Sequence, residues 1–161
     1  MAKETEIKFE IEKNIFSEYS QLLNKLNLID TKYGKYITHS IPTSNAASTL
    51  NYGVIFIARH PIEIIRISET HAVASASSAS LNIEKLEQGQ ALTLGTSLLT
   101  TAFDLTTTAN IPVVKEGKDL IANRKLREND RIGLVISGTL TGLSDLCITI
   151  YYKEILQDYI Y

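Results

Sequence analysis

The sequence predicts a mainly β protein, a jelly-roll-like antiparallel β-sandwich preceded by an N-terminal strand and helix. Two observations support this. From about Asn51 to Lys153, short segments of alternating apolar and polar residues recur between turn residues, at the spacing of about 8 to 12 residues that is typical of all-β folds. Convincing helical spacing, by contrast, is confined to a single segment that follows Asn14.

The clearest strands lie near the carboxyl end. Arg131 to Ser137 and Leu146 to Lys153 both alternate, and Gly138 and Gly142 mark the connection between them. The two strands therefore either pair directly or face each other across two packed sheets. In the second strand Leu146, Ile148, Ile150 and Tyr152 share one face. The residues predicted to form the core are Ile132, Leu134 and Ile136 of the first strand and Ile148 and Ile150 of the second.

Two apolar faces precede the sandwich. The first segment alternates as a strand would, and the next repeats apolar residues at helical spacing after a candidate cap at Asn14. Such faces need a partner, either their own sandwich or another protein, and the residues leave both hypotheses open. The candidate partner interface consists of Ile7, Phe9 and Ile11 on the strand and Tyr19, Leu22, Leu23 and Leu26 on the helix.

A change in composition suggests where the domains divide. Residues 31–50 are rich in Gly, Pro, Ser, Thr and Asn and show little periodicity, as expected of a linker with at most one short strand. We therefore expect an N-terminal attachment segment at residues 1–45 and a β-sandwich domain with an aromatic C-terminal tail at residues 46–161.

Composition also limits the classes of partner. The chain has 161 residues, 44% of them hydrophobic and 21% charged, which suits one globular core with an appendage. Its formal net charge of -2 argues against a nucleic-acid partner. The longest apolar run, Val54 to Ala58, is too short for membrane insertion, and the charged start does not resemble a secretory signal. The single cysteine, Cys147, fits synthesis in a reducing cytoplasm.

No constellation of residues predicts catalysis, and we expect no enzyme, cofactor or metal site. His39, His60 and His71 have no second ligand at short spacing, so each is expected to be exposed or partly packed. Asp104 and Asp119 have no recognisable partner, and Glu84 with Lys85 is expected to be a solvated pair.

Two further segments suggest self-association. Residues 72–80 are almost all small, which is typical of a flexible loop but also permits close approach of subunits. The last residues are more apolar and aromatic than a free tail requires. We predict an oligomer interface at Tyr159, Ile160 and Tyr161.

Four motifs carry a family resemblance. They are Leu81 to Leu86, Leu98 to Asn110, Leu126 to Leu134, and the Gly-Thr-Leu-Thr-Gly-Leu connection before the last strand. Together they resemble a β-sandwich module of virion structural proteins of tailed bacteriophages. The similarity covers about residues 64 to 153. The sequence departs from the module at Asn129, where glycine is usual, a change that the turn can absorb.

The resemblance implies a non-enzymatic capsid decoration or head-fibre subunit. Such a protein would be made in the host bacterial cytoplasm, bind the major capsid protein or another virion protein, assemble as a homotrimer and display its sandwich on the particle surface. The alternative is a receptor- or glycan-binding module of a tail fibre or spike, with a host-surface glycan as partner. A hydrolase is a third hypothesis, but no residue supports it.

Overall fold

The computed structural model describes residue 15 and residues 17–22, 34–41 and 53–155. The chain divides into two compact units, Met1–Gly34 and Lys35–Tyr161, which are treated separately below. In the first unit, Ile15 and residues 17–22 are helical, which agrees with the helix predicted after Asn14. The predicted strand around Ile7, Phe9 and Ile11 lies outside the described residues.

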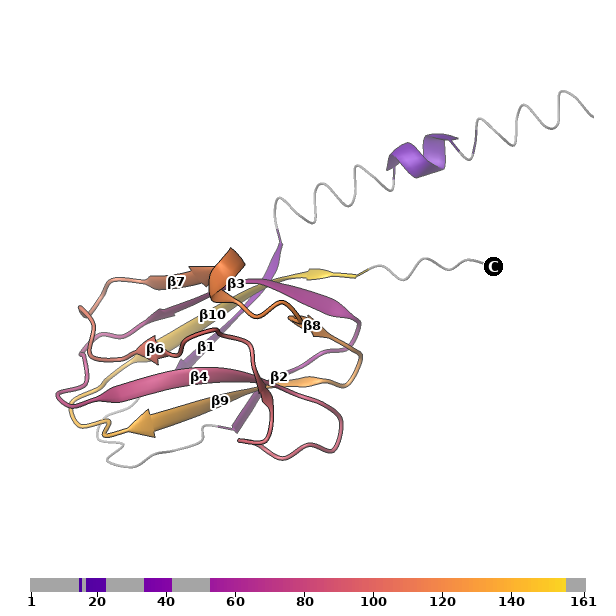
Figure 1. Cartoon of the computed structure of the whole chain (residues 1–161). Coiled ribbons are helices and arrows are strands. Elements are labelled where there is room, and N and C mark those ends of the chain that lie inside the picture. Colours follow the sequence, from indigo (N-terminus) through magenta and orange to yellow (C-terminus); the bar gives the residue numbers. More distant parts are fainter. Residues whose placement is uncertain (1–14, 16, 23–33, 42–52, 156–161) are drawn as a thin grey trace, which may run out of the picture. The chain divides into compact units, whose positions relative to one another are not determined.

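The second unit is a β-sandwich of two five-stranded antiparallel sheets (Figure 1). Sheet A contains β1, β10, β3 and β7 in that order, with β8 also paired to β3, and sheet B contains β2, β9, β4 and β5, with β6 also paired to β4. The strands are β1 (Lys35–Ile41), β2 (Gly53–Ile57), β3 (Ile62–Thr70), β4 (Ala79–Leu86), β5 (Thr96–Ser97), β6 (Phe103–Asp104), β7 (Val113–Glu116), β8 (Lys125–Leu126), β9 (Arg131–Gly138) and β10 (Leu146–Glu154), with one short 3-10 helix, η1 (Gly117–Asp119).

The strand order is that of a jelly roll. Since β5 and β6 both pair with β4, and β7 and β8 both pair with β3, each couple fills one strand position. Three connections stay within one sheet: β4 to β5, β5 to β6, and β7 to β8. Every other connection crosses from one sheet to the other. This arrangement of eight strand positions in two sheets is the jelly-roll topology, and it confirms the predicted fold class.

The predicted core positions are buried. Ile132, Leu134, Ile148 and Ile150 have no exposed surface, and Ile136 is 2% exposed. They belong to one hydrophobic cluster that fills the space between the sheets. Because β9 lies in sheet B and β10 in sheet A, these strands face each other across the sandwich, which is the second of the two arrangements predicted for them.

The first strand of the sandwich lies inside the predicted linker. β1 pairs with β10 over its whole length, from Lys35 opposite Tyr152 to Ile41 opposite Leu146. The second compact unit therefore starts at Lys35, before the expected boundary at residue 46. The segment was hard to recognise because an edge strand that carries threonine, serine and histidine shows little hydrophobic alternation.

The turn before β9 is built as its residues suggest. Asn129 has a φ of 68°, the left-handed conformation in which asparagine replaces glycine at low cost. Its N–H donates to the carbonyl of Ala58 (2.8 Å), and the Arg127 N–H donates to Oδ2 of Asp130 (2.8 Å). These bonds fix the connection into β9, so Asn129 does not disturb the turn.

Candidate interaction surfaces

The helical segment of the first unit exposes three large apolar side chains. Ile15, Tyr19 and Leu22 are 61%, 59% and 55% exposed. Their spacing of four and three residues places them on one side of a helix. Tyr19 and Leu22 are the described part of the predicted partner interface, and Ile15 extends the same side of the helix. Leu23 and Leu26 lie outside the described residues.

β1 begins and β10 ends at the same end of the sandwich. Lys35, where β1 begins, pairs with Tyr152 near the end of β10. The N–H of Ile155 donates to the carbonyl of Pro61 (2.8 Å), which extends the ordered chain just beyond β10. The predicted oligomer contacts Tyr159, Ile160 and Tyr161 lie outside the described residues.

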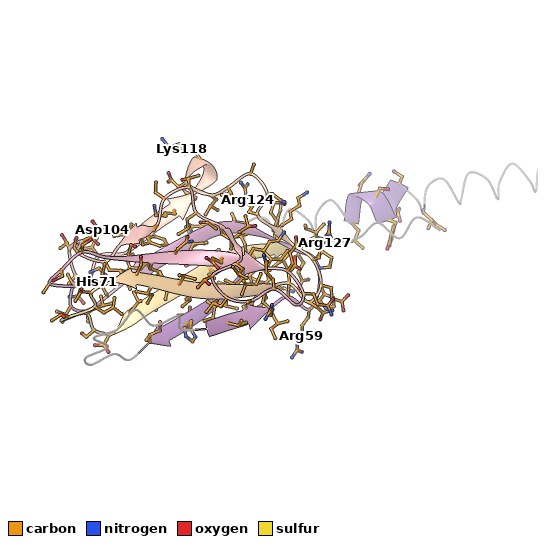
Figure 2. All side chains as sticks on the ribbon, turned by 60° about the horizontal axis from the view of Figure 1, so that its bottom comes forward. Arg59, His71, Asp104, Lys118, Arg124 and Arg127 are labelled. Atoms are coloured by element: carbon orange, nitrogen blue, oxygen red, sulfur yellow. The ribbon has the colours of Figure 1, made fainter. Side chains whose placement is uncertain are left out.

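The opposite end of the sandwich contains a buried ionisable pair that the sequence did not reveal. His71 was expected to be exposed or partly packed, but it is 1% exposed, and Glu69 beside it is also 1% exposed. Nδ1 of His71 lies 2.7 Å from Oε1 of Glu69, and Nε2 lies 3.0 Å from the carbonyl oxygen of Thr107. Figure 2 shows His71 and Asp104 at the same end, away from Arg59 and Arg127.

The protonation of this pair follows from its geometry. A carbonyl oxygen only accepts, so Nε2 of His71 carries a hydrogen and donates it to Thr107. The 2.7 Å contact between Nδ1 and the Glu69 carboxyl then requires one further hydrogen. Burial raises the pKa of Glu69 above its ordinary value, although the contact with His71 opposes the shift. A neutral pair, in which the carboxyl group of Glu69 donates to Nδ1, satisfies both contacts without buried charge.

The spacing of Glu69 and His71 in the sequence is consistent with their burial, but it is recognised only once the structure is known. Glu69 and His71 are two residues apart at the end of β3, where both side chains point to the same side. The neighbouring inward residues, such as Ile67, are fully buried. We infer that a Glu-x-His spacing that continues an apolar alternation marks a paired, buried histidine.

A second polar cluster corrects another expectation. Glu84 and Lys85 were expected to be solvated, but they are 6% and 8% exposed. Nζ of Lys85 donates to the carbonyl of Lys125 (3.0 Å) and lies 3.9 Å from Oδ2 of Asp130. Oε2 of Glu84 accepts from the N–H of Gly95 (3.3 Å), because the loop after β4 folds back over this part of sheet B. These contacts hold loops in place and assemble no reactive group.

The outward side of sheet A presents a row of aromatic and charged side chains. Tyr36, Tyr151, Arg66 and Glu116 occupy facing positions on β1, β10, β3 and β7. The tyrosine ring centroids are 5.8 Å apart, and the guanidinium carbon of Arg66 lies 3.9 Å above the centre of the Tyr151 ring. We call this set the Tyr36 row. The sequence did not reveal it, because it depends on the register between distant strands.

Two hollows open on the surface of the sandwich. The larger, about 400 Å³, lies beside Asp104, and its lining includes Ser78, Ser80 and Thr106. Hydrogen bonds from the Thr106 hydroxyl and N–H lower the pKa of Asp104, so this carboxylate is an acceptor over a wide range of pH. The smaller, about 280 Å³, lies between Phe56 and Tyr152.

Two kinds of feature, clusters of metal-ligating side chains and long apolar helices, do not occur in the residues that the structure describes. Across residues 15, 17–22, 34–41 and 53–155, no three His, Cys, Asp or Glu side chains gather closely enough to hold a metal ion. No helix within these ranges is long and apolar enough to cross a membrane.

Comparison with known proteins gives only distant likenesses. No family model matches the chain, and no curated protein matches it. A solved structure of Bacillus endospore appendages, described as a family of disulfide-linked pili, is 14% identical over 75% of this chain and 88% of its own, with a TM-score of 0.37. Structures of the Gt and Gx strains of infectious bursal disease virus are 11% and 10% identical, with TM-scores of 0.30 and 0.22. The match covers 77% of this chain but only 35% and 38% of those viral chains, so these similarities assign no family.

Proposed function

We propose that this chain is a non-enzymatic structural subunit of a tailed-bacteriophage particle, a capsid decoration or head-fibre protein. Its first 30 or so residues attach it to the particle, and its jelly roll is displayed on the particle surface. The observation that carries the proposal is the exposed apolar side of the N-terminal helical segment, at Ile15, Tyr19 and Leu22.

The physical argument rests on what each unit needs. The jelly roll from Lys35 onward encloses its own hydrophobic cluster between two sheets, so it has no evident need for a further core element. A short helix is marginal in water on its own, and exposed apolar side chains gathered on one side of it are stabilised when a partner covers them. An attachment device has these two properties.

We propose the major capsid protein, or another virion protein, as that partner. The predicted strand at Ile7, Phe9 and Ile11 would add to a sheet edge of the partner and gain main-chain hydrogen bonds. The helix would place Tyr19 and Leu22, and by sequence Leu23 and Leu26, into an apolar groove. The family resemblance in the jelly-roll motifs supports this choice of partner.

We also propose that the protein is a homo-oligomer, a trimer by analogy with the phage proteins that it resembles. Closed symmetric assembly buries apolar patches such as the predicted contacts at Tyr159, Ile160 and Tyr161. Several copies would also bind one particle with several attachment segments, which raises the overall affinity.

A glycan-binding function is the second candidate. The hollow beside Asp104 favours it, because Asp104 lies at the end of the sandwich away from Arg59 and Arg127 (Figure 2). Serine and threonine hydroxyls and an ionised carboxylate would bond to the hydroxyl groups of a sugar. Loss of saccharide binding on Asp104→Ala would support this function.

Attachment is tested by substitutions on the helical segment. Tyr19→Ser and Leu22→Ser should each weaken binding to purified particles by about tenfold or more, since truncating a residue that dominates an interface costs about 2 kcal/mol or more and about 1.4 kcal/mol is tenfold. The melting temperature of the jelly roll should not change. Co-sedimentation with particles measures the binding, and mass spectrometry of the particles should detect the chain as a component.

Gln21→Ser provides the matched control, because it changes the same helical turn away from the apolar side. It should bind as the unmodified protein does. Equal binding by all three variants would contradict attachment through this side of the helix.

A further inference from the structure

We propose that the outward side of sheet A is an interface between copies of this chain, in which Arg66 of one copy contacts Glu116 of another. This inference rests on the proposed homo-oligomer and identifies the surface that forms it. It concerns the Tyr36 row, which lies on a different unit from the proposed attachment helix.

Arg66 is held in place but has no acceptor. Its guanidinium carbon lies 3.9 Å from the centre of the Tyr151 ring, within the range of a cation–π contact that holds the group over the ring. Within the described residues, no carboxylate or carbonyl oxygen lies within hydrogen-bonding distance of it. A guanidinium group has five donors in a fixed geometry, so this one is well placed to bind a carboxylate that another molecule supplies.

Glu116 lies next to Arg66 and, among the residues that the structure describes, also has no charged partner. The two residues face each other on β7 and β3, but their side chains form no ion pair. On the same strand as Arg66, Glu63 is paired: Nζ of Lys153 lies 3.1 Å from its carboxylate, and the Arg124 guanidinium lies 3.4 Å from it. Arg66 and Glu116 differ from Glu63 in that neither forms an ion pair within the described residues.

The chemistry of the row favours a second copy as the partner. A surface that carries one unpaired cation beside one unpaired anion is complementary to itself, so closed symmetry can bring Arg66 of each copy to Glu116 of another. On the same side of sheet A, Tyr36 is 66% exposed, and Val114, two residues before Glu116 on β7, is 46% exposed. Tyrosine and arginine are enriched in protein interfaces and among the residues that dominate binding energy.

Charge reversal tests the interface, with static light scattering at micromolar concentration as the measurement. The unmodified protein should be an oligomer. Arg66→Glu and Glu116→Arg should each raise the dissociation constant at least tenfold, because each places like charges opposite one another. The doubly reversed protein should regain the mass of the parent, and a mixture of the two single variants should associate more strongly than either alone.

Two further variants separate this effect from others. Lys118→Glu makes the same change of charge as Arg66→Glu, but in η1, and should leave the mass unchanged. Tyr36→Ser removes an exposed ring from the edge strand and should also weaken association while the protein stays folded, as judged by its melting temperature.

Three results would each overturn the interface: a monomeric parent protein, an unchanged mass in Arg66→Glu, or a double variant that fails to reassociate. A monomer whose binding to particles still depends on Tyr19 and Leu22 would reject the interface and leave the attachment proposal standing.

Discussion

Replacing Ile148 with aspartate is expected to abolish folding of the jelly roll. Ile148 has no exposed surface and lies in the central cluster between the sheets. The substitution removes a buried apolar side chain and leaves an unpaired carboxylate in its place, at a cost of more than about 5 kcal/mol, which is comparable with the whole stability of a typical domain. Circular dichroism should show no cooperative thermal transition.

Thr149→Asp is the matched control, because the next residue of β10 points to the other side of the sheet. Its hydroxyl group lies 3.2 Å from that of Thr38 on the outward side. The cost should be about 1 kcal/mol, set by the lower strand propensity of aspartate. If the Ile148 variant melted like the parent, or if both variants failed equally, the register of β10 would be wrong.

Glu69→Ala is expected to lower the free energy of unfolding by about 1 to 3 kcal/mol, the usual cost of leaving a buried neutral acceptor without its hydrogen bond. The substitution leaves Nδ1 of His71 buried without its partner. Glu69→Gln should cost much less, because a glutamine amide can donate to Nδ1 as the protonated carboxyl group does. Urea unfolding at weakly acidic pH measures the difference between these two variants.

The pH dependence of the pair has a definite sign. Burial raises the pKa of Glu69 above its ordinary value of 4.5, so the folded protein keeps this proton to a higher pH than the unfolded chain does. The contribution of Glu69 to stability is therefore complete below pH 4.5 and is lost as the pH rises through the raised pKa. The parent should lose stability relative to Glu69→Gln over that interval, whereas a constant difference would mean that folding does not change the pKa of Glu69.

The core of the jelly roll was predictable because β9 and β10 show strict alternation. Residues such as Ile132 and Ile150 are therefore assigned to the correct side by sequence alone. β1 was less predictable, because its inward positions include His39 and its outward ones Thr38 and Ser40. Membership of an edge strand in a sheet is decided by pairing with β10 and not by local pattern.

The two surfaces on which the proposals rest, the apolar side of the helix and the Tyr36 row, also differ in how far the sequence predicts them. The apolar side of the helix was visible in the sequence at Tyr19 and Leu22, because its residues are close in the chain. The contact of Arg66 with Tyr151 arises from the register of β3 against β10, which no local pattern encodes. The partner of His71 was overlooked because two polar residues at the end of a strand ordinarily indicate exposure.

The most direct test of the central claim is binding of residues 35–161 to purified particles, compared with binding of the whole chain. We expect the shortened protein to stay folded, with a cooperative thermal transition, because both sheets and their core lie within it. It should no longer co-sediment with particles, because the segment with Tyr19 and Leu22 has been removed. Aggregation of residues 35–161, or binding as strong as that of the whole chain, would contradict the claim that attachment and display belong to separate units.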